Sequence, residues 1–178
     1  MMMKMLEAGG ILPFQDGIRE ADDDNPKGYY EYEKVKDLAT DSSWLHKASG
    51  SAIKIISSLL FYLPENLAYK IIFMQRDISE VLASQKKMLS RSGQESSNGI
   101  SDDVMAAKFS IHLRRIKKHL SDINTIETLY LPYRDVITAP EEQAKKVTSF
   151  LKQNLDIEKM AQIVDNNLYR QRKSSNEA

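Results

Sequence analysis

Residues 69–90 have the sequence YKIIFMQRDISEVLASQKKMLS, and this stretch decides the fold. Its apolar run of 71–74 predicts a buried strand at 69–74, and the helical pattern that follows at once predicts a helix over 78–91. Arg76 therefore stands where a strand ends and a helix begins. Open α/β sheets bind ligands at such points, and the free amides of a helix N-terminus favour anions. Ser84 lies two turns into the helix, so Arg76 and Ser84 together indicate a phosphate-binding site.

The alternation of strand and helix patterns continues along the chain. Hydrophobic periodicity and turn residues predict strands at 52–57, 69–74 and 125–131 and helices at 1–8, 31–46, 78–91, 102–122, 139–153 and 157–164. Thr138, Pro140 and Glu141 are expected to open the helix at 139–153 as N-cap, early proline and capping-box acid. This order predicts an α/β fold, a parallel sheet flanked by helices, within one domain spanning 1–178. The polar segment 92–101 is expected to be a mobile loop, and the tail 173–178 is expected to fray.

Composition excludes several classes of function. The 178 residues include 25 basic and 25 acidic side chains, so the net charge is zero and no nucleic-acid partner is expected. The chain has no cysteine, which excludes a disulfide framework, a thiolate metal site and a cysteine nucleophile and is compatible with the cytoplasmic location that we expect. No apolar run approaches the roughly 18–20 residues of a membrane span.

Five segments in order carry a family resemblance. They are DNPKGYYE at 24–31, AIKII at 52–56, RDISEVLAS at 76–84, LPYRDV at 131–136 and VDNNLYR at 164–170. Their order and spacing resemble the sulfotransferase family, particularly its bacterial members, which are built on a P-loop NTPase-like fold. The likeness extends over nearly the whole chain, although each segment taken alone is a weak signal.

The resemblance implies a reaction and a donor. Members transfer a sulfuryl group from 3′-phosphoadenosine 5′-phosphosulfate to a hydroxyl or amine, and here the acceptor would be an unidentified small molecule or saccharide. By position, Arg76 and Ser84 would bind the 3′-phosphate of the donor. Their chemistry is suitable, because arginine presents a planar fork that matches phosphate oxygens and a serine hydroxyl can donate a further hydrogen bond.

Two departures from the family pattern lead to further expectations. The resemblance implies a strand and a glycine-containing phosphate loop before the first helix, but this sequence starts with that helix. We therefore expect an N-terminally incomplete domain, without the first strand and the phosphate loop, that is inactive by itself. The base is also open: no histidine follows 52–57, where cytosolic members place theirs, and Ser57 and Ser58 stand there instead. Glu31 is the candidate catalytic base.

Each candidate residue also has an ordinary structural interpretation. Arg76 can cap the ends of strand and helix or pair with Asp77 or Glu80, and Ser84 can be a packed helix residue. An acidic cluster at 22–24 lacks the spacing of a calcium loop and favours a solvated loop over a cation site. In the helix at 102–122, His112 and His119 are expected at the edge of the core rather than in a metal site. The basic residues of this helix are expected on a solvated face rather than in the lining of a cleft; they are Lys108, Arg114, Arg115, Lys117 and Lys118.

Two functional hypotheses of different classes follow. In the first, the full gene product is a sulfotransferase and supplies the phosphate loop from upstream sequence, which reading the DNA before Met1 would test. In the second, the chain is a non-catalytic relative that binds a nucleotide weakly or acts through protein contacts. A nucleotide kinase or hydrolase is disfavoured, because neither a lysine-bearing phosphate loop nor an acidic metal ligand is evident. The sequence leaves the oligomeric state open.

Overall fold

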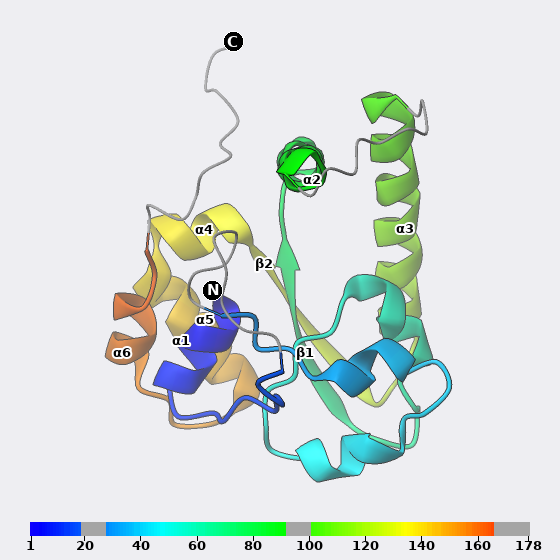
Figure 1. Ribbon diagram of the computed structural model, residues 1–178. Helices are drawn as coiled ribbons and strands as arrows, with labels where there is room; N and C mark the ends of the chain where they lie inside the picture. The colour runs from blue at the N-terminus through cyan, green and yellow to red at the C-terminus, as the bar shows by residue number, and fades with distance from the viewer. Residues whose placement is uncertain (19–27, 92–100, 166–178) are drawn as a thin grey trace.

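The computed structural model describes residues 1–18, 28–91 and 101–165 (Figure 1). Within these ranges the sheet has two parallel strands, β1 (Tyr69–Gln75) and β2 (Ile126–Pro132), paired from Tyr69↔Ile126 to Gln75↔Pro132. Figure 1 shows helices on both sides of the sheet. One side has α1 (Met2–Ala8), α4 (Tyr133–Thr138), α5 (Pro140–Leu151) and α6 (Ile157–Gln162). The other side has α3 (Asp102–Asp122), while α2 (Ile78–Arg91) follows β1 at the upper edge. The predicted α/β class is therefore confirmed.

Side-chain alternation along the strands builds one core on each face of the sheet. Ile72 and Met74 pack against the first core, whereas Ile71 and Phe73 belong to the second. The first core is formed mainly by Met5, Leu131, Val136, Ala144, Val147 and Met160, and the second by Leu38, Trp44, Leu60, Phe73, Ile116 and Leu120. Because both faces of the sheet are covered, the strands expose polar groups mainly at their ends, where ligands can reach them.

The N-terminal helix ends as its glycines predict. Gly10 has a φ of +106°, a conformation that favours glycine, and its N–H donates to Glu7 O at 3.0 Å. The Ile11 N–H donates to Leu6 O at 2.9 Å, which completes a Schellman motif with both apolar side chains buried. The chain therefore turns sharply after α1, toward the segment that pairs with Ala52.

Helices α2 and α3 have the bounds that the sequence predicts. The Ser101 side chain caps α3 by accepting from Val104 N at 3.4 Å, and Asp77 precedes α2 with its carbonyl accepting from Val81 N at 3.1 Å. Strand β1 begins at Tyr69 as predicted and ends at Gln75, one residue later than predicted, and β2 lies one residue later than 125–131. Helix α6 ends at Gln162, two residues before the predicted end.

The helix predicted at 31–46 is wrong. Two short 3₁₀ helices replace it, η1 (Glu33–Asp37) and η2 (Ser43–Ala48). Between them the Asp41 carboxylate accepts from the Ser43 N–H at 2.9 Å and from its hydroxyl at 2.6 Å. Short polar side chains compete in this way with helical hydrogen bonds, so the polar run at 40–43 interrupts the helix.

The strand predicted at 52–57 is also wrong. Only Ala52 forms a bridge, to Pro13, and the chain enters a third 3₁₀ helix, η3 (Ser57–Tyr62), directly afterwards. Residues 53–56 have no ladder partner among the described residues, so an apolar run alone is not enough to make a strand here.

The predicted start of the helix at 139–153 needs a correction as well. Thr138 is not an N-cap, because it closes the unpredicted helix α4 and its hydroxyl donates to Arg134 O at 3.1 Å. Ala139 takes the N-cap position without a side-chain hydrogen bond, and Pro140 is the first residue of α5, as expected. Three predicted features lie outside the described residues. They are the mobile loop at 92–101 except for Ser101, the frayed tail at 173–178 and the acidic cluster at 22–24.

Candidate functional site

Arg76 lies at the carboxyl end of β1, beside the start of α4. The last register pair is Gln75↔Pro132, so Arg76 and Tyr133 are the next residues on the two neighbouring strands. The Arg76 guanidinium carbon lies 5.2 Å from the centroid of the Tyr133 ring, within cation–π distance. Burial raises the pKa of the Tyr133 phenol, so the ring stays neutral beneath the cation.

Glu80 is the charged partner of Arg76. Arg76 Nε donates to Glu80 Oε2 at 3.1 Å, and the glutamate side chain is only 7% exposed. This confirms the structural alternative in which Arg76 pairs with Glu80, one turn into α2. A carboxylate this well buried needs a cation beside it, so Arg76 already stabilises one negative charge at the edge of the sheet.

Asp77 fixes where α2 begins. Its Oδ1 accepts from the Ser79 N–H at 2.9 Å and from the Ser79 hydroxyl at 2.5 Å. The helix therefore starts at Ile78, two residues after Arg76, with the positive end of its dipole near the guanidinium. An anion at this point would meet both the cation and the helix terminus.

Ser84 lies on the same face of α2 as Glu80, one turn further along. Four helical residues correspond to a rise of about 6 Å, so half-buried Ser84 lies beyond the Arg76–Glu80 pair rather than within it. The structure thus places Ser84 on the side of α2 that faces Arg76, and its phosphate-binding role stays a prediction.

Glu31 has a charged partner of its own. Lys54 Nζ lies 2.9 Å from Glu31 Oε1 and also donates to Tyr29 O at 3.1 Å. The same ammonium is 5.6 Å from the centroid of the Tyr29 ring. Because an adjacent cation stabilises the ionised carboxylate, this pairing makes Glu31 a poorer proton acceptor.

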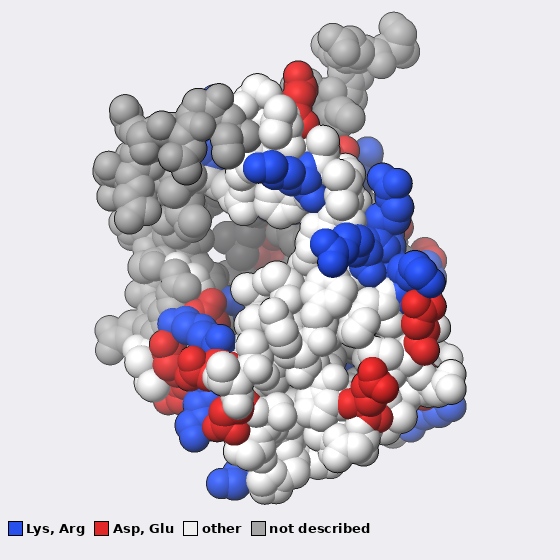
Figure 2. Space-filling model, turned by 90° about the vertical axis from the view of Figure 1, so that its right-hand side faces the viewer, with Lys and Arg blue, Asp and Glu red and all other residues white. Residues whose placement is uncertain are grey.

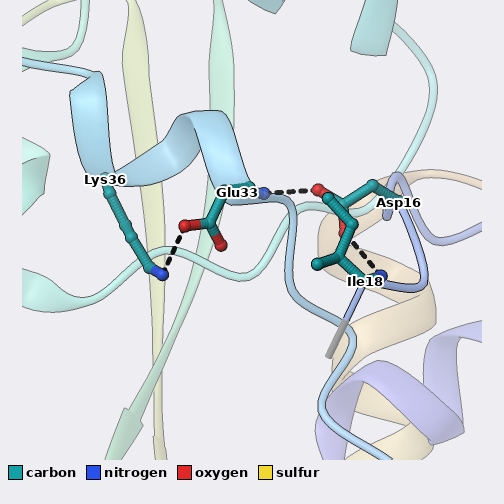
Figure 3. Close-up of polar contacts among 4 residues, drawn as sticks. All are labelled: Asp16, Ile18, Glu33 and Lys36. Carbon is teal, nitrogen blue, oxygen red and sulfur yellow. Dashed lines mark hydrogen bonds and ion pairs between the residues drawn. The ribbon is translucent and has the colours of Figure 1, made fainter. Parts of the chain in front are cut away.

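The backbone around Glu31 is held by several polar contacts. The Asp16 N–H donates to Glu31 O at 3.3 Å, and the Asp16 carboxylate accepts from the N–H groups of Glu33 at 2.6 Å and Ile18 at 3.1 Å (Figure 3). The Glu33 N–H and then the Ile18 N–H lower the pKa of Asp16. On the other side of Glu31, the Tyr30 hydroxyl donates to Glu7 of α1, and burial together with this carboxylate raises the pKa of Tyr30 to about 12.

Several contacts of charged and aromatic groups are absent from the sequence-based prediction. Lys54 is the charged residue that interrupts the apolar run at 52–56, and that interruption is the signal that could have indicated its role. Tyr133 follows β2 directly, but the sequence alone does not show that the two strands are neighbours. His112 contacts Ser57 across 55 positions, and no local pattern predicts that contact.

Comparison with known protein families identifies the family of this chain. A family model described as the sulfotransferase family matches residues 22–156, which is more than half of the chain. The chain belongs to the sulfotransferase family. No curated protein and no solved structure gave a significant match.

The sulfotransferase match includes both strands and all three predicted site residues, Glu31, Arg76 and Ser84. It confirms the resemblance found in the sequence at the level of the family. The P-loop NTPase-like topology and the expected lack of a phosphate loop stay predictions, as do the roles of the individual residues.

Two searches of the described ranges 1–18, 28–91 and 101–165 gave negative results. None of their helices is both long enough and apolar enough to cross a bilayer. None of their His, Asp and Glu residues form a group of three or more that could hold a metal ion.

Proposed function

We propose that this sulfotransferase-family protein binds 3′-phosphoadenosine 5′-phosphosulfate and transfers its sulfuryl group to a hydroxyl or amine acceptor. The observation that supports the donor site is the position of Arg76, between the carboxyl end of β1 and the start of α2. In this proposal Arg76 and Ser84 bind the 3′-phosphate. Family membership supports the reaction class, and the acceptor is a small molecule or saccharide.

The Arg76–Glu80 pair fits an anion-binding role at this point. Glu80 holds the guanidinium by its Nε, and the guanidinium carbon lies 5.2 Å from the centroid of the Tyr133 ring. A side chain oriented in this way is preorganised, so less conformational entropy is lost when it binds phosphate. The negative charge of Glu80 also repels a bound phosphate. The affinity for the donor therefore depends on how far the Arg76 guanidinium exchanges its contact with Glu80 for contacts with the phosphate.

Sulfuryl transfer requires an acceptor oxygen or nitrogen to attack sulfur while the bond from sulfur to the 5′-phosphate oxygen breaks. The protein must align the two groups, stabilise negative charge and remove the proton of the acceptor. Glu31 stays a prediction as the base, and its ion pair with Lys54 counts against that role. A cytoplasmic location also stays a proposal, supported by the absence of cysteine.

A second candidate function has a specific observation in its favour. Arg76 and Glu31 both have charged partners within the fold, Glu80 and Lys54. A non-catalytic relative would retain charged residues whose ion pairs lie within the fold. Its function would be weak nucleotide binding or contacts with other proteins. Activity measurements separate the two possibilities.

The test uses the product of the complete open reading frame, incubated with sulfur-labelled donor and with phenol, N-acetylglucosamine or tyramine as acceptor probes. We expect donor-dependent label in at least one acceptor, at a rate well above the reaction without protein. Binding of 3′-phosphoadenosine 5′-phosphate without transfer to any probe or to water would contradict the enzymatic proposal and favour the non-catalytic alternative.

A further inference from the structure

Ser57 and His112 form a hydrogen-bonded pair between η3 and the middle of α3. Ser57 Oγ lies 2.9 Å from His112 Nε2, and both side chains are half-buried. Their sequence neighbours Ile56 and Ile111 are 61% and 54% exposed, so the pair lies close to the protein surface. A serine hydroxyl within hydrogen-bond distance of an imidazole is the arrangement in which histidine can remove a proton.

The topology places this pair toward the same edge of the sheet as Arg76. Phe73 of β1 and Ile116 of α3 belong to one core, and α3 runs antiparallel to β1 (Figure 1). Arg76 follows Phe73 along β1, and His112 precedes Ile116 by one turn of α3. Both steps lead from the core toward the carboxyl edge. The Ser57–His112 pair thus lies on the side of this core that is nearer the carboxyl ends of the strands, as Arg76 does.

The surroundings of His112 are aromatic and cationic. The Phe61 ring of η3 meets the imidazole edge-on, at 6.2 Å between centroids, and η3 contains no charged residue. Lys108 and Arg115 lie one turn before and one turn after His112 on α3, and both are exposed. Figure 2, which shows the α3 side of the molecule, has Lys and Arg side chains gathered in its upper half. Positive charge at this position would stabilise a negatively charged group during transfer.

We propose that His112 is the general base of the transfer reaction and that the Ser57 hydroxyl relays the proton, an inference that rests on the proposed function. The acceptor O–H proton passes to Ser57 Oγ while the Ser57 proton passes to His112 Nε2. The acceptor oxygen forms its bond to sulfur, and the bond from sulfur to the 5′-phosphate oxygen breaks, which releases 3′-phosphoadenosine 5′-phosphate. His112 then gives its proton to solvent. In this role Nδ1 of the neutral ring carries the proton and Nε2 accepts.

The test compares His112→Gln with His119→Gln in the product of the complete reading frame. His119 is a matched control, because it lies on the same helix and packs against the same Phe61 ring, at 4.9 Å. Glutamine can still hydrogen-bond to Ser57 but cannot act as a base. We expect His112→Gln to lower the turnover number with phenol as acceptor by roughly 100-fold or more, which is typical for loss of a general base. We expect His119→Gln to leave this turnover number within about threefold.

Three further readouts separate a base from a structural residue. The affinity for 3′-phosphoadenosine 5′-phosphate should be unchanged in His112→Gln. The acid limb of the wild-type pH–rate profile, which a base produces when it gains a proton, should be absent in this variant. The effect of the variant should also be much smaller with 4-nitrophenol assayed well above neutral pH, where most of this phenol is already ionised and needs no base.

Equal losses with phenol and 4-nitrophenol would overturn the proposal, because they would indicate a structural role. A His112→Gln rate near that of the wild type would overturn it too. A wild-type protein that does not bind the nucleotide, or that binds it and transfers sulfuryl to no acceptor probe, would instead contradict the proposed function itself.

Discussion

Replacing Arg76 with alanine should weaken binding of 3′-phosphoadenosine 5′-phosphate strongly. A charge-assisted hydrogen bond to phosphate contributes about 1.5–3 kcal/mol, which corresponds to roughly 10- to 150-fold in affinity. The guanidinium is positioned for this role by Glu80 and by the Tyr133 ring. Isothermal titration calorimetry on the product of the complete reading frame gives the dissociation constant directly.

The Arg76→Ala substitution has a second effect that needs a control. It leaves Glu80, which is 7% exposed, without this partner, and loss of one partner of a buried pair costs on the order of 3 kcal/mol in stability. Glu80→Gln breaks the same ion pair but keeps the guanidinium, so it should bind the nucleotide at least as tightly as the wild type. Arg76→Lys keeps the charge without the planar fork and should be intermediate. If Glu80→Gln lost as much affinity as Arg76→Ala, the loss would reflect folding and the phosphate assignment would be wrong.

The second large effect is expected from Leu131→Ala. Leu131 is 2% exposed, pairs in register with Met74 and immediately precedes the Pro132–Tyr133 turn beside Arg76. A leucine-to-alanine change in a packed core typically costs about 2–5 kcal/mol through lost burial and the cavity that remains. Urea unfolding monitored by circular dichroism measures this cost.

Leu12→Ala is the matched control for Leu131→Ala. Leu12 is 74% exposed, and its carbonyl, which accepts from Ala52 N, is unaffected by truncation of the side chain. We expect its free energy of unfolding to change by no more than about 0.5 kcal/mol. Similar costs for the two substitutions would contradict the placement of Leu131 in the core that supports the site.

The sequence predicts those parts of the fold that local signals determine. Helices α2 and α3 have the predicted bounds because Asp77 and Ser101 begin them and apolar periodicity sustains them. The strands were found because their apolar runs are bounded by turn residues. The helix at 31–46 failed because side-chain hydrogen bonds of Asp41 interrupt it. The strand at 52–57 failed because a strand needs a partner, which is a tertiary property.

In the candidate site, too, the sequence predicts what local patterns determine and not what depends on distant chain segments. Arg76 was found because a strand and a helix meet there, and Glu80 was found as its possible partner because residues four apart share a helix face. The contacts of Tyr133, Lys54 and His112 were missed because they join chain segments 23 or more positions apart. Local sequence patterns contain no information about such contacts.

The most direct test of the donor site compares two nucleotides that differ only in the 3′-phosphate. Calorimetric titration of the wild-type product of the complete reading frame with 3′-phosphoadenosine 5′-phosphate and with 5′-AMP isolates that group. We predict that the nucleotide with the 3′-phosphate binds at least roughly 10-fold more tightly, as one charge-assisted contact provides, and that Arg76→Ala removes most of the difference. Equal affinity of the wild-type protein for both nucleotides would contradict the assignment of Arg76 to the donor 3′-phosphate.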